Sequence, residues 1–159
     1  MLRDLKRAGL KMTPQRIAIV HLFAEDESHP TAQALFERLQ PDFPSMSFAT
    51  VYNTLDALAS AGLSSTLRLG SALGSALGGA ARFDPNTTAH HHAVCDGCGA
   101  VHDVPAETLK PSTGSVRRLE RTTPGFSVRS VERIYRGLCA SCRRKPVKTV
   151  SQHNLPKEQ

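Results

Sequence analysis

The four cysteines of this chain constrain its fold more than any other feature, because they form two matched pairs. Cys95 and Cys98 make one Cys-x-x-Cys pair, and Cys139 and Cys142 make the other. Two such pairs are typical of a structural zinc site with four thiolate ligands. A metal of this kind can stabilise a small domain that lacks a large core. The pairs therefore predict that zinc holds the C-terminal part of the chain together.

The ends of the chain bear on its compartment and its partners. The first eleven residues, MLRDLKRAGLK, hold no apolar core of signal-peptide length, and no apolar run approaches the roughly 20 residues that span a bilayer. We therefore expect a cytoplasmic protein without a membrane partner. In that reducing compartment the cysteines are expected to be metal ligands and not disulfides.

The net charge of +6 is concentrated at the two ends of the chain. Residues 1–23 carry five basic residues against Asp4, and residues 143–159 carry five against Glu158. A basic N-terminal arm beside helices is typical of phosphate binding and indicates a nucleic-acid partner. A solvated basic face would give the same charge pattern.

Capping residues and apolar spacing predict three helices in the first half of the chain. The first begins at Thr13-Pro14 and the second at Pro30-Thr31, and prolines at 41 and 44 end the second. The apolar positions of these two helices follow: Ile17, Val20 and Phe23 in the first, and Ala34, Leu35 and Leu39 in the second.

The third predicted helix follows Ser47 and ends at Ala61-Gly62. Its apolar face is predicted to comprise Phe48, Val51, Leu55, Leu58 and Ala59. The opposite face is small or polar, with Ala49, Thr50, Asn53, Ala57, Ser60 and, on its flank, Tyr52. Such a face suits a recognition helix in a major groove, although an ordinary surface helix has similar amphipathicity. The order helix, turn, helix and wing favours DNA binding.

The second half of the chain changes to strand-like patterns. Residues 64–83 are predicted to form a β-hairpin wing, with a flexible insertion at about 69–81 where Gly-Ser-Ala-Leu occurs twice in succession. Strands are expected at 90–94, 100–104, 126–131 and 134–138, with a less regular helix within 106–121. We expect residues 146–159 to be a disordered basic tail. The fold class is therefore α+β.

Six motifs in register resemble the ferric uptake regulator (Fur) family of bacterial metal-dependent repressors. They span roughly residues 5–145 in order, and they are Lys11–Arg16, His29–Ala32, Ser47–Leu55, Arg82–Asp84, His90–Cys95 and the final Cys-x-x-Cys. The resemblance implies a winged helix-turn-helix DNA-binding domain over 1–83 and a small α/β dimerisation and metal-binding domain over 84–145. It also implies a homodimer on a palindromic double-stranded DNA operator, with structural zinc on Cys95, Cys98, Cys139 and Cys142.

The resemblance further implies a regulatory iron or manganese ion between the domains. Its ligands carry over to His29, Asp84, His90, His92 and Asp103. Three imidazoles with two carboxylates suit ferrous iron or manganese better than zinc, and on a strand His90 and His92 share one face. Each histidine taken alone is better explained by a core or solvent-exposed role. The DNA-contacting positions are expected to be Lys11, Arg16, Thr50, Tyr52 and Asn53.

Aspartates at positions 84 and 103, with Tyr52-Asn53, look most like the peroxide-sensing PerR branch. In that branch, peroxide and bound ferrous iron oxidise a ligand histidine, here His29 or His90, and repression ends. The alternative is an iron- or manganese-responsive uptake regulator without peroxide sensing. An enzyme is not expected: a zinc hydrolase or deaminase would need a glutamate beside the histidines. A dithiol oxidoreductase leaves the second cysteine pair unexplained, and a zinc-ribbon adaptor leaves the helical half unexplained.

Overall fold

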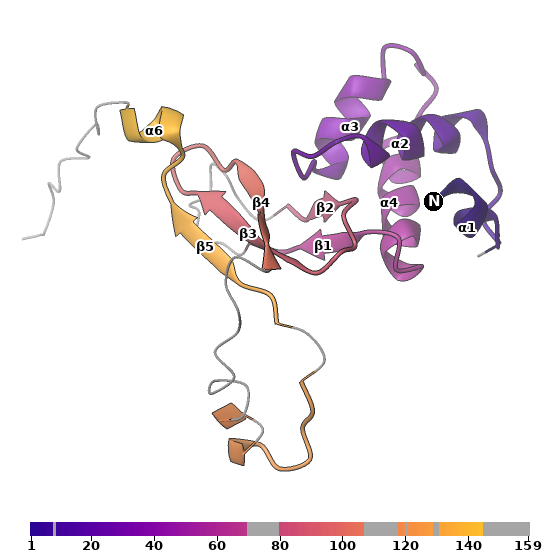
Figure 1. Cartoon of the computed structure of the whole chain (residues 1–159). Coiled ribbons are helices and arrows are strands. Elements are labelled where there is room, and N and C mark those ends of the chain that lie inside the picture. The colour runs from indigo at the N-terminus through magenta and orange to yellow at the C-terminus, as the bar shows by residue number, and fades with distance from the viewer. Residues whose placement is uncertain (8, 70–79, 107–117, 120, 129–130, 145–159) are drawn as a thin grey trace, which may run out of the picture.

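The computed structural model describes residues 1–7, 9–69, 80–106, 118–119, 121–128 and 131–144. A helical body comes first, a two-stranded wing follows, and a three-stranded sheet lies beyond the wing (Figure 1). The helices are α1 (Leu2–Arg7), α2 (Pro14–Ala24), α3 (Ala32–Leu39), α4 (Phe48–Ser60) and α6 (Ala140–Arg144). The strands are β1 (Ser65–Leu67), β2 (Arg82–Asp84), β3 (His90–Cys95), β4 (Val101–Pro105) and β5 (Ile134–Gly137).

The three predicted helix starts are confirmed, and each uses a side-chain cap. Thr13 Oγ1 accepts from the Arg16 backbone N–H, and Thr31 Oγ1 accepts from that of Ala34 at 3.1 Å. Ser47 Oγ accepts from the Thr50 N–H at 3.1 Å. Each bond satisfies a backbone donor that the first helical turn leaves without a partner, which is why these sites start helices.

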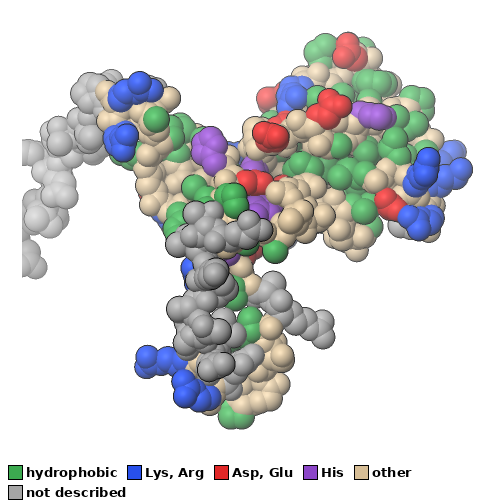
Figure 2. Space-filling view, in the orientation of Figure 1, with side chains coloured by type: hydrophobic (Ala, Val, Ile, Leu, Met, Phe, Trp, Pro, Cys, Tyr) green, Lys and Arg blue, Asp and Glu red, His purple; other side chains and the backbone are tan. Residues whose placement is uncertain are grey.

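The basic N-terminal arm forms the helix α1, which was not predicted from the sequence. Leu5 is completely buried against the helical core, and this apolar contact holds a helix that is too short to be stable alone. The basic side chains Arg3, Lys6 and Arg7 stay exposed on it. Figure 2 shows Lys and Arg side chains gathered at this end of the helical body.

The helical core contains most of the predicted apolar positions. Val51, Leu55 and Leu58 of α4 are completely buried. Phe48 and Ile17 were predicted to be in the core, but they are 43% and 38% exposed. Both lie in the first turn of their helix, where neighbouring helices enclose side chains less. Phe48 packs only at the edge of the core, with its ring perpendicular to that of Phe36.

The two sheets are joined by an apolar contact. In the wing, β1 pairs with β2 antiparallel, which confirms the predicted hairpin strands, while residues 70–79 of the predicted insertion lie outside the described residues. The other sheet has the order β4-β3-β5, with β5 parallel to β3 at one edge. A small core of Leu67, Leu69, Val94 and Val101 connects the wing to this sheet.

The strand predicted at 126–131 is wrong for the residues that can be compared. Residues 126–128 and 131 are not in a strand. Phe126 closes a turn onto the Thr123 carbonyl instead, and Gly125 in that turn has a φ of +83°. Phe126 and Val131 are exposed, and within the described residues neither of them pairs with a neighbouring strand.

Other predictions concern segments that are described only partly. Most of the predicted helix at 106–121 lies outside the described residues, although the Thr123 N–H donates to the Leu119 carbonyl as in a helical turn. The predicted tail at 146–159 lies entirely outside them. Within the described segments, no helix combines the length and apolarity needed to cross a membrane.

Candidate metal centres

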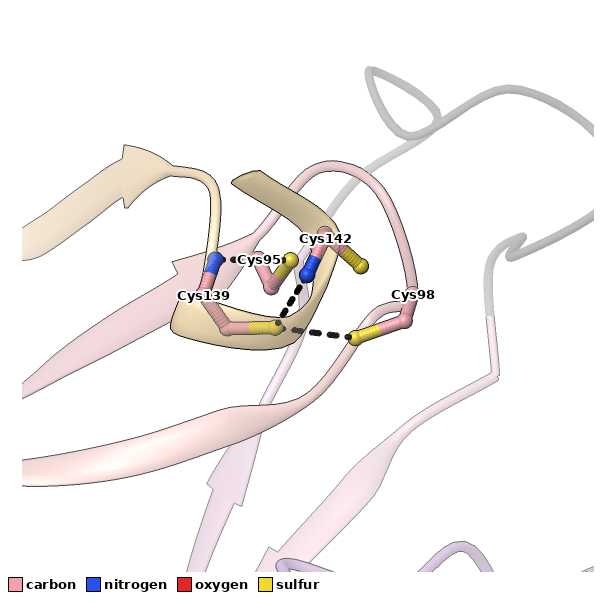
Figure 3. Close-up of side chains that lie close together, drawn as sticks. All are labelled: Cys95, Cys98, Cys139 and Cys142. Carbon is pink, nitrogen blue, oxygen red and sulfur yellow. Dashed lines mark hydrogen bonds between the residues drawn. The ribbon is translucent and has the colours of Figure 1, made fainter. Parts of the chain in front are cut away.

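The four cysteines come together at the end of the sheet farthest from the helical body (Figure 3). Cys95 ends β3, Cys98 follows in the next turn, and Cys139 and Cys142 flank the start of α6. Their Sγ atoms all lie within 4.8 Å of one another, and none forms a disulfide. We call this group the cysteine cluster. Its geometry is that of four ligands around one point.

The thiols of the cysteine cluster differ strongly in acidity. The Cys139 backbone N–H donates to Cys95 Sγ at 3.2 Å and is the main reason that the pKa of Cys95 falls to about 6. The hydrogen bond with Cys139 raises the pKa of Cys142 to about 12. Sulfurs this close cannot all ionise unaided, because like charges repel, whereas a divalent cation would stabilise all four thiolates.

A side chain at position 97, in the turn between Cys95 and Cys98, would be crowded by the second cysteine pair. A Cβ atom on Gly97 would lie 3.0 Å from both Cβ and Sγ of Cys142. Glycine therefore allows the second cysteine pair to approach the first. Glycine is favoured here by the space that it leaves for Cys142 and not by a special backbone conformation, and this close approach fits four thiolates that share one ion.

A second cluster forms where the wing, the sheet and the helical body meet. His29 lies in the loop before α3, Asp84 ends β2, His90 and His92 lie on β3, and Asp103 lies on β4. One ligand atom from each of the five lies within 4.8 Å of all the others. We call them the histidine–aspartate cluster. Figure 2 shows histidine and acidic side chains side by side at this junction.

The Nε2 atoms of the three histidines point into the histidine–aspartate cluster. His90 Nε2 lies 2.9 Å from both Asp84 Oδ2 and His92 Nε2. His29 Nε2 lies 2.8 Å from Asp103 Oδ1, yet this buried atom has no hydrogen bond of proper geometry within the described part of the chain. Buried nitrogens that converge without good hydrogen-bond partners fit a site that would hold a cation.

Both strand histidines are oriented through the other ring nitrogen. His90 Nδ1 donates to the Thr88 carbonyl at 2.6 Å, and His92 Nδ1 donates to Glu132 Oε1 at 3.0 Å. A proton on Nδ1 leaves the Nε2 lone pair of a neutral imidazole free to bind a metal. Two such lone pairs 2.9 Å apart repel each other unless they share a proton or a cation.

Burial and charge prepare these groups for ligation. Burial raises the pKa of Asp84, but the His92 hydrogen bond and the Asn86 N–H outweigh it, and the net pKa is lowered. Burial lowers the pKa of His29 despite Asp84 and Asp103 nearby. Asp84 is thus held ionised and His29 neutral, which are the protonation states that bind a metal. Burial lowers the pKa of His92, but the hydrogen bond with Asp84 and the charge of Glu132 outweigh it and the net pKa is raised, so a metal would compete with a proton at this residue.

His29 reaches the cluster through an unusual backbone conformation. Its φ of +55° lies in the left-handed region, which is uncommon for a residue with a side chain. Arg82 Nη1 donates to the His29 carbonyl at 3.0 Å, and the Phe83 N–H donates to the Pro30 carbonyl at 2.9 Å. The wing strand β2 therefore holds the loop that carries His29.

Two residues around this cluster were not predicted. Asn86 Nδ2 donates to Asp103 Oδ2 at 2.8 Å, and Glu132 contacts His92. The pattern Asp84-x-Asn86 resembles a turn in which a side chain accepts from the backbone two residues on, and this signal could have indicated Asn86. No sequence signal links Glu132 to His92, because 40 positions separate them.

Of the predicted DNA-contacting residues, some have exposed side chains and others are half-buried and make contacts within the protein. Lys11, Tyr52 and Asn53 are exposed, and Tyr52 also packs perpendicular to Phe83 of the wing. Arg16 is half-buried and donates to the Lys11 carbonyl at 2.7 Å. Thr50 is half-buried, and its hydroxyl lies 2.9 Å from that of Ser47.

Comparisons with known proteins agree on one family. The Ferric uptake regulator family matches residues 7–140. A Peroxide-responsive repressor PerR of Staphylococcus aureus is 33% identical over 142 residues, which cover 89% of this chain and 88% of that protein. The solved structure of the Campylobacter jejuni peroxide stress regulator is 28% identical with a TM-score of 0.62, and the match covers 89% of this chain and 98% of that chain. The Vibrio cholerae ferric uptake regulator is 25% identical with the same TM-score of 0.62, and covers 86% of this chain and 98% of its own. This chain belongs to the ferric uptake regulator family, whose members regulate transcription and are not enzymes.

Proposed function

We propose that this protein is a cytoplasmic, metal-dependent transcriptional repressor that binds a palindromic operator as a homodimer. In this proposal the cysteine cluster holds structural zinc, and the histidine–aspartate cluster holds a regulatory ferrous iron or manganese ion. The observation that supports it most is the origin of the ligand atoms: His29 comes from the helical body, and the other four residues come from strands. A metal held by both parts would fix their relative orientation.

The control of DNA binding follows from that link. In a dimer, the two α4 helices must sit at a fixed spacing to meet two half-sites of an operator. If His29 is not held to the strands, the helical bodies must be ordered during DNA binding, which lowers affinity. The donor set of three imidazoles and two carboxylates fits iron or manganese, and that of four thiolates fits zinc.

We propose that peroxide is the signal that ends repression. Bound ferrous iron would supply the chemistry that turns peroxide into an oxidant at the site. His29 and His90 are the proposed targets, and a histidine that gains an oxygen atom becomes a poorer ligand. Asp103 is the exposed side of the cluster, with 37% of its side chain accessible, and offers peroxide a route in. The similarity to a peroxide-responsive repressor and to a peroxide stress regulator supports this choice.

The second candidate function is an iron- or manganese-responsive uptake regulator without peroxide sensing. The same ligands would serve it, and the similarity to the Vibrio cholerae ferric uptake regulator favours it. The two functions differ in their expected response to peroxide. A peroxide sensor loses DNA binding in its iron form and keeps it in its manganese form, whereas an uptake regulator keeps it in both forms.

The deciding experiment uses an operator selected from random duplex DNA with the manganese form of the protein. Affinity is measured for the iron and manganese forms before and after stoichiometric peroxide, and peptides are analysed by mass spectrometry. We expect the iron form alone to release DNA, with one added oxygen on His29 or His90. Unmodified histidines and retained binding would favour the uptake regulator. Metal-independent binding would refute both functions.

A further inference from the structure

We propose that Glu132 is a positioning residue for the regulatory metal, holding His92 in the orientation and tautomer that present Nε2 to a divalent transition metal. The proposal rests on the proposed function insofar as a metal occupies the histidine–aspartate cluster. In this proposal the five cluster residues bind the metal directly, whereas Glu132 affects metal affinity by positioning one of them.

The position of Glu132 excludes it from the ligand set and makes it a partner of one ligand. Its Oε1 lies 3.0 Å from His92 Nδ1, while His92 Nε2 faces Asp84 and His90. The two nitrogens lie on opposite sides of the imidazole ring. Glu132 therefore contacts the outer side of His92 and does not reach the point on which the Nε2 atoms converge.

The sheet brings Glu132 to this place. The parallel pairing of β3 and β5 aligns His92 with Ile134, and the His92 N–H donates to the Arg133 carbonyl at 3.0 Å. Glu132 directly precedes the residue that accepts this bond. The backbone thus fixes the approach of Glu132, and the buried His92 ring, only 2% exposed, has little freedom to turn away.

The acceptor on His92 differs in charge from the acceptor on His90. His90 Nδ1 meets a neutral carbonyl, whereas His92 Nδ1 meets a carboxylate. A charged acceptor makes the stronger hydrogen bond and raises the electron density on the opposite nitrogen. We infer that His92 is the more firmly oriented ligand of the two.

The expected effect follows from the exposure of Glu132. Loss of such an outer partner typically weakens metal binding about 10- to 100-fold. Because the Glu132 side chain is 54% exposed, water can replace part of its role. We therefore expect an effect at the lower end, about tenfold.

The test titrates the full-length, zinc-loaded protein with cobalt(II), whose absorption spectrum reports the ligand field, and then with manganese(II). Glu132→Ala should weaken binding of both ions about tenfold and alter the cobalt spectrum. Glu132→Gln, which keeps an oxygen acceptor, should recover about half of this loss on a logarithmic scale. Glu37→Ala removes an exposed glutamate on α3 and serves as the matched control. All three variants should keep the wild-type zinc content. Without the regulatory metal, they should also keep the wild-type urea midpoint.

Separate outcomes would overturn the two proposals. If His92→Ala abolishes cobalt binding but Glu132→Ala leaves affinity and spectrum unchanged, the role of Glu132 is refuted and the metal site stands. A lower affinity matched by a lower urea midpoint, or no recovery in Glu132→Gln, would likewise refute positioning. If the wild-type protein binds no cobalt beyond the zinc site, the proposed function and the role of Glu132 both fail.

Discussion

Replacement of Arg136 by methionine should weaken DNA binding without touching either metal cluster. Arg136 lies on β5, and its Nη2 donates to the Leu69 carbonyl at 2.7 Å. Leu69 lies two residues after the wing strand β1. Arg136 Nη1 lies 3.4 Å from Oδ1 of Asp96, which lies between the two cysteines of the first pair. Methionine keeps most of the apolar length of arginine but removes its donors. The small apolar core and the contact of Asp84 with His90 would then remain as links between the wing and the sheet.

The magnitude can be worked from these two contacts. A hydrogen bond from a charged donor contributes about 1.5–3 kcal/mol when well buried. Because Arg136 is 34% exposed, about 1–1.5 kcal/mol is expected for the Leu69 contact. The long, exposed pair with Asp96 adds about 0–0.5 kcal/mol. If DNA binding requires the wing in this position, the total of about 1–2 kcal/mol lowers affinity about 5- to 30-fold.

The assay is operator affinity of the manganese-loaded protein at fixed salt, compared with Asp96→Asn, which loses only the weaker contact. We expect Asp96→Asn to change affinity by less than about threefold, in line with the small worth of exposed ion pairs. Zinc and manganese contents are measured in parallel. Unchanged affinity in Arg136→Met, with both metals bound, would show that the contact does not position the wing for DNA. An equal loss in Asp96→Asn would assign the effect to the cysteine turn.

Four further predictions concern the two clusters and the proposed DNA contacts. Cys95→Ser should lose zinc and destabilise the protein by several kcal/mol, measured by metal analysis and urea unfolding; a folded, zinc-free DNA binder would contradict the structural assignment. Tyr52→Ala should reduce discrimination between operator and random DNA by about 1–3 kcal/mol. An unchanged ratio of operator affinity to random-DNA affinity in Tyr52→Ala would show that this face of α4 does not contact the bases. Lys11→Ala should instead weaken binding to all DNA sequences alike and lower the slope of affinity against salt concentration by roughly one. In the metal-free protein, the lowered pKa of Asp84 contributes stability above its unfolded value of about 3.9, and this stability is lost as pH falls through the folded value. Asp84→Asn should therefore be less stable than wild type at pH 7, and urea midpoints should converge below about pH 4; a constant gap would exclude this titration.

The elements that the sequence predicted well depend on signals within a few residues. Each of the helix starts after Thr13, Thr31 and Ser47 needs only a capping side chain and a backbone N–H three positions on. The same holds for His90 and His92, because residues two apart on a strand share a face.

Local patterns failed where a partner was needed. Residues 126–131 have the composition of a strand, yet the residues described there have no neighbouring strand and form a turn instead. The N-terminal segment looks like a charged arm, but Leu5 finds a place in the core and a helix forms. In both cases the outcome depends on whether tertiary contacts complete the element, which a short window of sequence does not contain.

The sequence by itself therefore determined which residues have metal-binding chemistry, and the tertiary structure decided how they are supported. The members of the cysteine cluster and of the histidine–aspartate cluster were identifiable from residue type, spacing and family motifs. The left-handed His29, the Glu132 contact with His92 and the Arg136 contact with Leu69 were not. The last two join residues 40 and 67 positions apart, and only the packing of wing, sheet and helical body brings such groups within hydrogen-bonding distance.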